Sequence, residues 1–156
     1  MNKVINLLKT DSEDSLITIS ISGMAGVGKT SLAKAVHNRI YHKFDATRFV
    51  YDVRHQAQHT NGIAKMQRHI LKDLVKFKDK VNDEAHGKSL MRDRLMSIRA
   101  LVILEYVGDN KQLDSLRGDW YGPGSRILVI TLDPQLLNDG QVDFVYEVQA
   151  REGACS

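Results

Sequence analysis

The sequence is poor in cysteine and proline and has no long apolar run. Its single cysteine, Cys155, lies close to the end of the chain and cannot build a disulfide framework, so we expect a reducing compartment. No stretch approaches the ~20 consecutive apolar residues of a membrane helix, and residues 1–15 (MNKVINLLKTDSEDS) lack the apolar core of a signal peptide. We therefore expect no membrane contact and a cytoplasmic location, with the nucleus as the alternative.

The length and composition are those of one globular domain. With 156 residues, of which 42% are hydrophobic and 26% charged, the chain can bury a real core, and disorder is not expected. We assign residues 1–148 to this domain and residues 149–156 to a short tail, because the last letters, REGACS, match no structural or functional pattern.

The charge is unevenly distributed along the chain. Residues 39–99 contain 14 Lys/Arg and 7 Asp/Glu, whereas residues 100–156 contain 4 and 9. Basic residues recur at helical spacing from Lys65 to Lys76, as in a surface for nucleic acid or an acidic partner. The same segment also carries a matching apolar face, so the solvated side of an amphipathic helix is the preferred interpretation, and we do not expect nucleic-acid binding.

Apolar strand patterns alternate with helical ones along the chain. Alternation of this kind predicts an α/β fold in which helices cover both faces of a parallel sheet. Residues 100–107 (ALVILEYV) form a nearly continuous apolar run, which is typical of a central strand buried on both faces. The predicted strands are 15–22, 46–54, 100–107, 126–133 and 142–149, and the predicted helices begin near Lys29, Gly62, Lys88, Asn110 and Pro134.

A glycine-rich loop lies between the first strand and the first helix. Residues 23–30 (GMAGVGKT) fit the pattern G-x-x-x-x-G-K-[ST] completely. The glycines allow the backbone to approach a phosphate, the helix adds its positive end, and Lys29 can reach the β- and γ-phosphates. The hydroxyl of Thr30 can bind Mg²⁺. We therefore expect ATP or ADP with Mg²⁺ as cofactors, and a nucleotide-binding loop of Gly23, Met24, Ala25, Gly26, Val27, Gly28, Lys29, Thr30 and Ser31.

The run LVIL followed by Glu105 predicts the second half of the site. A strand of apolar residues that ends in an acid commonly holds the metal opposite such a loop. Glu105 can orient a water on Mg²⁺, so we name Thr30 and Glu105 as metal-side residues and Glu105 as the candidate catalytic acid. Tyr106 occupies the place where a water-activating acid often lies, and a phenol with a pKa near ~10 is a poor base at neutral pH.

Four motifs in order resemble the nucleotide-binding part of the plant NB-ARC domain. These are GMAGVGKTSLAKAVHNRI, FVYDVR, LVILEYVGDNKQLDSL and DWYGPGSRILVITLD, and the resemblance extends from about Asn2 to Val148. The sequences of the FVYDVR and DWYGPGSR motifs resemble those of receptors with an N-terminal TIR domain more closely than those of the coiled-coil class. The resemblance implies a P-loop NTPase fold, a three-layer α/β/α sandwich with a mostly parallel five-stranded sheet. It also implies a switch module of leucine-rich-repeat immune receptors, with nucleotide and other receptor or signalling chains as partners.

The chain departs from the family pattern at positions that the family uses for ATP hydrolysis and for sensing the γ-phosphate. The family usually has two aspartates at the positions of Glu105 and Tyr106, and an arginine that senses the γ-phosphate at the position of Leu132. Ala25 in place of a glycine is a mild change. Helical and winged-helix subdomains, a TIR domain and repeats are not among these residues, and a natural short product, a degraded gene and a cut fragment all stay open.

These departures predict binding without efficient hydrolysis. Loss of one charge-stabilising or water-positioning group commonly costs about 10²–10³ in rate. We therefore expect an ADP/ATP-binding module with weak or absent ATPase activity. The alternative is a non-catalytic interaction module that associates with full-length receptors without nucleotide. A small-molecule kinase is disfavoured because no arginine-rich lid is evident.

His55 and His59 stand four residues apart, as metal ligands on a helix can. No cysteine or acid completes a ligand set, so exposed histidines are the preferred interpretation.

Overall fold

The computed structural model describes residues 1–12, 15–24, 26–133, 135, 137 and 141–149. Helices and strands alternate through most of the chain, as the sequence patterns predict. In chain order the elements are α1 (Asn2–Leu8), β1 (Ile17–Ser22), α2 (Lys29–Ile40), the 3-10 helix η1 (Tyr41–Lys43), β2 (Ala46–Val50), α3 (Val53–Ala57), α4 (Gly62–Val75), α5 (Glu84–Arg94), β3 (Ala100–Glu105), α6 (Asn110–Arg117), β4 (Arg126–Ile130) and β5 (Phe144–Glu147).

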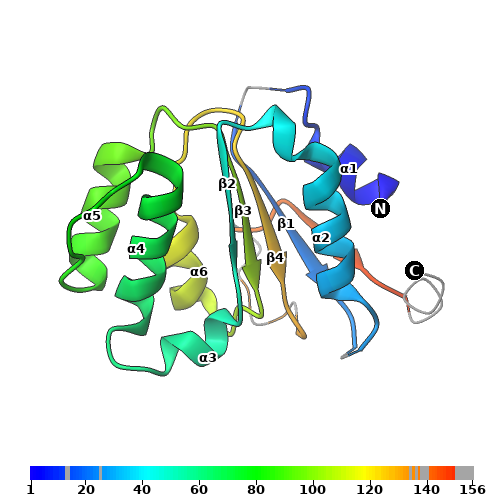
Figure 1. Cartoon of the computed structure of the whole chain (residues 1–156). Coiled ribbons are helices and arrows are strands. Elements are labelled where there is room, and N and C mark those ends of the chain that lie inside the picture. Colours follow the sequence, from blue (N-terminus) through cyan, green and yellow to red (C-terminus); the bar gives the residue numbers. More distant parts are fainter. Residues whose placement is uncertain (13–14, 25, 134, 136, 138–140, 150–156) are drawn as a thin grey trace.

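The five strands form one sheet in the order β2-β3-β4-β1-β5, and every neighbouring pair is parallel. The register sets Ile17 beside Arg126 and Glu105 beside Ile130. Because all strands run the same way, the segments that follow β1, β3 and β4 lie at the same edge of the sheet (Figure 1). The mostly parallel five-stranded sheet predicted from the sequence is confirmed.

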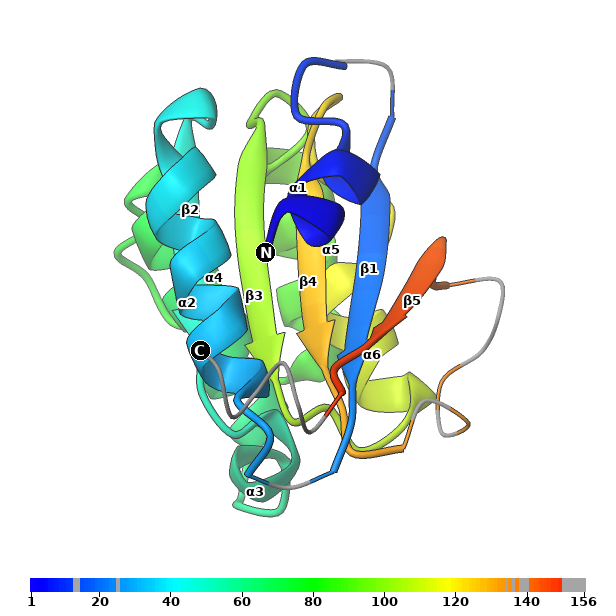
Figure 2. The ribbon, with the colours of Figure 1, turned by 90° about the vertical axis from the view of Figure 1, so that its right-hand side faces the viewer.

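Helices cover both faces of the sheet. Helices α1 and α2 lie on one face, and α3, α4, α5 and α6 lie on the other (Figure 1). The view turned by 90° shows α1 and α2 in front of the strands (Figure 2). The architecture is therefore the three-layer α/β/α sandwich that the resemblance implies.

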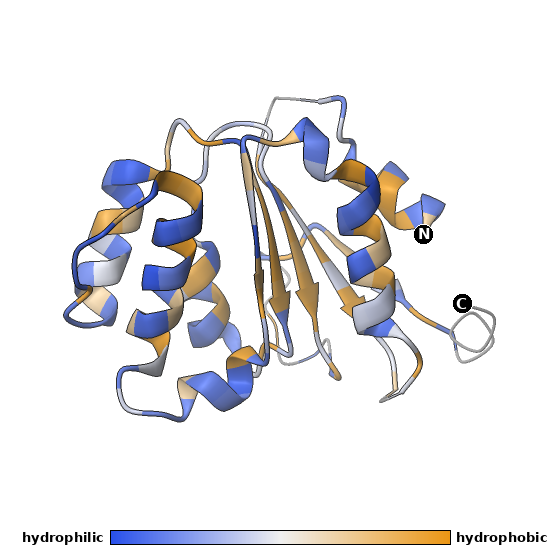
Figure 3. Ribbon diagram, in the orientation of Figure 1, coloured by the Kyte–Doolittle hydropathy of each residue, from blue (hydrophilic) through white to orange (hydrophobic). Residues whose placement is uncertain are grey.

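The central strand β3 separates two apolar clusters. Ala100, Val102 and Leu104 face the layer of α4, α5 and α6, whereas Leu101 and Ile103 face the layer of α1 and α2. Colouring by hydropathy shows apolar strands between helices whose polar residues lie outward (Figure 3). Burial on both faces explains why this segment is a continuous apolar run in the sequence.

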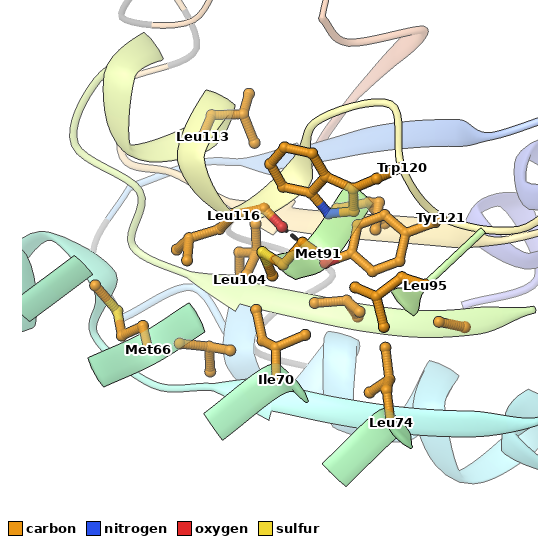
Figure 4. Packing of buried hydrophobic residues seen from close by; sticks show 14 of the residues in the cluster. Met66, Ile70, Leu74, Met91, Leu95, Leu104, Leu113, Leu116, Trp120 and Tyr121 are labelled. Carbon is orange, nitrogen blue, oxygen red and sulfur yellow. Dashed lines mark hydrogen bonds between the residues drawn. The ribbon is translucent and has the colours of Figure 1, made fainter. Parts of the chain in front are cut away.

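The layer of α4, α5 and α6 packs around aromatic and sulfur-containing side chains. Met91 and Trp120 are buried there, and the Tyr121 hydroxyl donates a hydrogen bond to the Leu116 carbonyl at 2.7 Å (Figure 4). Burial raises the pKa of Tyr121 well above its usual value, so the phenol stays protonated. This layer is a packed core.

Several predicted element boundaries differ from the structure. Strand β2 ends at Val50 instead of residue 54, because Asp52 takes a left-handed conformation (φ 46°) and α3 begins directly after it. Strand β3 ends at Glu105 because Tyr106 is also left-handed (φ 55°). Helix α5 begins at Glu84 rather than at residue 88, since the Asp83 carboxylate caps it by accepting the His86 N–H at 2.7 Å.

Of the remaining predictions about helices and strands, one is confirmed, one helix was missed, and others fall outside the described residues. Helix α6 begins at Asn110 as predicted, and the Asp109 carboxylate caps it by accepting the Gln112 N–H at 2.9 Å. Helix α1 was not predicted. The helical turn expected at Pro134 lies outside the described residues, as does Cys155, and the division into a domain of 1–148 and a tail of 149–156 stays a prediction. Within the described part of the chain, no helix is both long enough and apolar enough to cross a membrane.

A buried arginine fastens the segment after α1 to the sheet. Arg126, at the start of β4, has no exposed surface, and each of its five N–H donors meets a backbone carbonyl. Nε donates to Leu8, Nη1 to Ser15 and Ser125 (2.7 and 2.9 Å), and Nη2 to Lys9 and Ser12 (2.9 and 3.0 Å). This network fixes where α1 lies, and with it the position of Met1.

Candidate functional site

The glycine-rich loop connects β1 to α2 and takes conformations that favour glycine. Gly23, Gly26 and Gly28 have φ of 147°, 82° and 94°. A Cβ at Gly23 would lie 3.0 Å from the Val148 carbonyl oxygen, so a side chain there would disturb the contact with the end of β5. Ala25 lies outside the described residues. The glycines of the motif thus permit the backbone path that the sequence predicted for a phosphate cradle.

Lys29 is the first residue of α2 and is 2% exposed. Its Nζ donates to the carbonyls of Gly23 at 2.9 Å and Met24 at 2.7 Å. An ammonium group has three donors, so two hold the loop and a third is available to a ligand. Burial lowers the pKa of Lys29, because the charged form loses hydration. The arrangement presents a partly desolvated cation at the positive end of a helix.

Thr30 and Glu105, the two predicted metal-side residues, are in direct contact. The Thr30 hydroxyl donates to Glu105 Oε2 at 2.9 Å, and the Asp52 N–H donates to Glu105 Oε1 at 3.0 Å. Glu105 is 8% exposed, and these bonds satisfy both of its oxygens. A hydroxyl and a carboxylate side by side are the oxygen ligands that Mg²⁺ takes, together with phosphate oxygens and water. The pair therefore fits a magnesium ion.

Tyr106 and Leu132 lie at the ends of β3 and β4. The Tyr106 ring packs against the apolar cluster of α1 and α2, and its carbonyl accepts the Arg54 N–H at 2.9 Å. Leu132 is 43% exposed and lines a small cleft with Tyr106, Thr131 and Arg54. Neither residue supplies a carboxylate or a positive charge at this edge.

A mostly apolar cavity of about 350 Å³ opens beside the loop. It lies at the start of α2, between the N-terminus of α1 and the end of β5. Of the predicted site residues that the structure describes, Gly28 and Ser31 line it. A flat heterocyclic base with its sugar matches this size and polarity. Its lining residues are Met1, Gly28, Ser31, Leu32, Ala35, Tyr146 and Val148.

Sequence reasoning missed several residues of the site. Met1, Tyr146 and Val148 reach the cavity from the two ends of the chain, and no motif marks them. Asp52 contributes a backbone N–H, which every residue except proline carries. A cavity of about 380 Å³ on the opposite layer, lined by Glu84, Lys88 and neighbours, shares no residue with the loop.

His55 and His59 do meet, with their Nε2 atoms 3.4 Å apart and their rings nearly perpendicular. Both are exposed. A search of the described residues finds no group of three or more His, Cys, Asp or Glu side chains that could hold a metal ion.

Comparison with known proteins matches the chain to one family. The family model described as the NB-ARC domain matches residues 1–150. Disease resistance protein RUN1 of Vitis rotundifolia is 32% identical over 143 residues, covering 88% of this chain and 11% of the relative. TMV resistance protein N of Nicotiana glutinosa is 35% identical over 142 residues, covering 85% of this chain and 12% of the relative. The chain thus spans about a tenth of the length of these relatives, with 11% and 12% covered.

Solved structures of other proteins share the fold of this chain. A chain in the structure of Drosophila ORC bound to DNA aligns with a TM-score of 0.61 and 15% identity, covering 94% of this chain and 40% of that one. Cdc6p from Pyrobaculum aerophilum aligns with a TM-score of 0.59 and 17% identity, covering 94% and 43%. At such low identity the likeness concerns the fold alone.

Proposed function

The chain belongs to the NB-ARC family, and from this premise we propose that it binds ADP or ATP with Mg²⁺ and hydrolyses ATP slowly or not at all. The proposed module comprises residues 1–148. The observation that carries the proposal is the position of Lys29, buried at the start of α2 with two donors on the loop carbonyls and a third left over.

Nucleotide phosphates would lie against the loop. The Lys29 ammonium would contact the β- and γ-phosphates, while the first N–H groups of α2 and the loop backbone would donate to the remaining oxygens. Phosphate binding would offset the desolvation that lowers the pKa of Lys29. The base would occupy the cavity between Met1 and Tyr146, where apolar side chains surround it.

Thr30 and Glu105 would hold the metal. Bound Mg²⁺ neutralises phosphate charge in such sites. The Thr30 hydroxyl would turn from Glu105 toward the ion, and Glu105, kept in place by the Asp52 N–H, would bind it directly or through a water. The proton of the Thr30 hydroxyl would stay available to Glu105.

Weak hydrolysis follows from what surrounds this pair. In the loaded site Glu105 would be engaged by the metal side and by the Asp52 N–H, so it is poorly placed to take a proton from an attacking water. The neighbouring Tyr106 ring packs into the apolar cluster and supplies no base. Leu132 offers no charge to a developing negative oxygen.

The biological role we propose is plant defence. Several relatives carry the name disease resistance protein, and the chain shares their NB-ARC domain. In this role the bound nucleotide would set the state of an immune receptor, and the partners would be other receptor chains or signalling proteins.

The test is to purify the chain, denature it and identify any released nucleotide by chromatography. The same preparation is assayed for phosphate release from ATP, next to Lys29→Ala. Lys34→Ala serves as a matched control, since Lys34 lies exposed on the same helix. We expect ADP or ATP in the wild type and in the control, none with Lys29→Ala, and little phosphate release.

Two outcomes would contradict the proposal. Clear turnover that depends on Lys29 would mean that Glu105 suffices as the acid despite Tyr106 and Leu132. A protein that binds no nucleotide would favour the interaction module, which would then capture its receptor partner equally well with and without Lys29→Ala.

A further inference from the structure

The cleft between the ends of β3 and β4 contains one cation. Among the described residues that line it, Arg54 is positively charged and Asp133 is negatively charged. Leu132 also lines it, with 43% of its surface exposed. The cleft lies at the same edge of the sheet as the Thr30–Glu105 pair.

The backbone and the side chain of Arg54 are both positioned by the segment after β3. The Arg54 N–H donates to the Tyr106 carbonyl at 2.9 Å. Its aliphatic stem covers Gly108, where an added Cβ would lie 2.9 Å from Arg54 Cγ and 3.2 Å from Cδ. Because Gly108 has no side chain, the arginine can extend from α3 past the end of β3 into the cleft that Leu132 lines after the end of β4.

The Arg54 guanidinium has no hydrogen-bond or ion-pair partner among the described residues, and the residue is exposed. Asp133, in the same cleft, forms no ion pair with it within 4.0 Å. The donors of this cation are thus available to a ligand. By contrast, Arg48 on β2 is paired with Asp73 at 2.6 Å.

Arg54 lies close in sequence to Asp52, a residue that contacts the candidate metal pair of Thr30 and Glu105. Asp52, two residues earlier, donates its N–H to Glu105 Oε1 at 3.0 Å. Two residues of chain span at most about 7 Å, so Arg54 lies close to this pair, and a terminal phosphate held by Lys29 next to Thr30 and Glu105 would lie near the Arg54 side chain. A guanidinium suits this ligand, because its planar fork binds two phosphate oxygens at once.

We propose that Arg54 contacts the γ-phosphate and makes the site prefer ATP to ADP, supplying from α3 the positive charge that Leu132, after the end of β4, does not supply. This inference rests on the proposed nucleotide binding. It assigns Arg54 as a specificity-determining residue, since ADP lacks the group that it contacts.

The test compares the affinities of ADP and of the non-hydrolysable β,γ-imido analogue of ATP for the full chain and for Arg54→Gln. We expect the analogue to bind about tenfold more weakly to the variant, as for one lost charge-assisted contact in a half-open site, and ADP to change by less than about twofold. Arg39→Gln is the matched control. It removes the same charge from an exposed position near the other end of α2 and should leave both affinities unchanged.

A second substitution asks whether the two positions serve the same phosphate. Leu132→Arg in the Arg54→Gln background should restore most of the lost affinity for the analogue and leave ADP binding unaltered. The inference would be overturned if Arg54→Gln left the ratio of the analogue affinity to the ADP affinity unchanged, whether both affinities fell equally or neither changed. If the wild type binds ADP and the ratio does not move, this inference alone is wrong. If the wild type binds neither nucleotide, the proposed function is wrong as well.

Discussion

Two buried cations, Lys29 and Arg126, lie at opposite edges of the same parallel sheet. Neither has a carboxylate partner among the described residues, and both donate to backbone carbonyls. Arg126, at the start of β4, uses all five of its N–H donors on carbonyls of residues 8–15 and Ser125. Lys29, after the end of β1, uses two of three.

The difference in donor use separates a structural cation from one that we propose to bind a ligand. A buried cation whose donors are all satisfied has nothing to offer a ligand, so Arg126 serves the fold. A cation with a donor left over, placed where strand ends and a helix start converge, is costly to keep unless an anion arrives. The comparison predicts that substitutions at Arg126 change stability and that substitutions at Lys29 change affinity.

The largest effect is expected for Arg126→Met. The substitution leaves buried carbonyls around residues 8–15 without donors, so we expect a loss on the order of 3 kcal/mol in the free energy of unfolding. Urea denaturation followed by circular dichroism measures it, with exposed Arg39→Met as control. A loss below about 1 kcal/mol would mean that water replaces the guanidinium easily.

Lys29→Met should reverse that pattern. We expect ADP affinity to fall by about 100-fold, near 2.7 kcal/mol, while the free energy of unfolding changes by less than about 1 kcal/mol. Removal of the buried charge offsets the two lost hydrogen bonds in the ligand-free protein. Calorimetric titration and urea denaturation of one preparation give both numbers. A large loss of stability would make Lys29 a structural cation like Arg126.

Arg126→Lys tests whether the number of hydrogen-bond donors at this position determines the free energy of unfolding. Lysine offers three donors instead of five, so at least two carbonyls lose their partner and the charge is kept. We expect a loss of about 1.5 kcal/mol in the free energy of unfolding, roughly half of that for Arg126→Met. Equal losses in the two variants would show that geometry, rather than charge or donor number, decides the stability.

The smallest effect concerns pH. Burial lowers the pKa of Lys29 from 10.5, so the ammonium that we propose to bind phosphate loses its proton at a lower pH than an ordinary lysine. ADP affinity should therefore fall a few-fold as the pH rises from about 7.5 toward the lowered pKa. The contribution of this group to ligand-free stability has the opposite sign and rises through the window up to 10.5, because the unfolded chain binds the proton more tightly. Titrations at several pH values check this, and Lys29→Met should abolish the dependence of affinity.

Local patterns predicted most of the fold. The apolar run of β3, the alternation of β1 and the cap of α6 at Asp109 each depend on neighbours within one element. Two of the boundaries that failed, the ends of β2 and β3, depend on backbone turns at Asp52 and Tyr106, where residues other than glycine adopt positive φ. Such turns are held by contacts across the sheet, like the bond from Arg54 to Tyr106, which no local pattern records.

The residues of the candidate site likewise fall into two groups, those that a sequence motif identified and those that only the tertiary structure brings to the site. The motif named Lys29 and Thr30, and the strand pattern named Glu105, because each chemistry requires a particular side chain at a particular spacing. Met1 and Tyr146 line the cavity because the tertiary fold brings the two ends of the chain together. An apolar residue near a chain end carries no mark of what it will face.

The sequence by itself determined the order of the five strands and of most helices, the glycine-rich loop and the residues at which this chain departs from its family. These features arise from interactions within a few residues, which composition and spacing encode. Tertiary structure alone decided that Thr30 meets Glu105 across 75 residues, that Arg126 reaches carbonyls more than 100 residues away, and that Arg54 shares a cleft with Leu132. Such contacts depend on the strand order and register of the whole sheet, and these form only when the complete core packs.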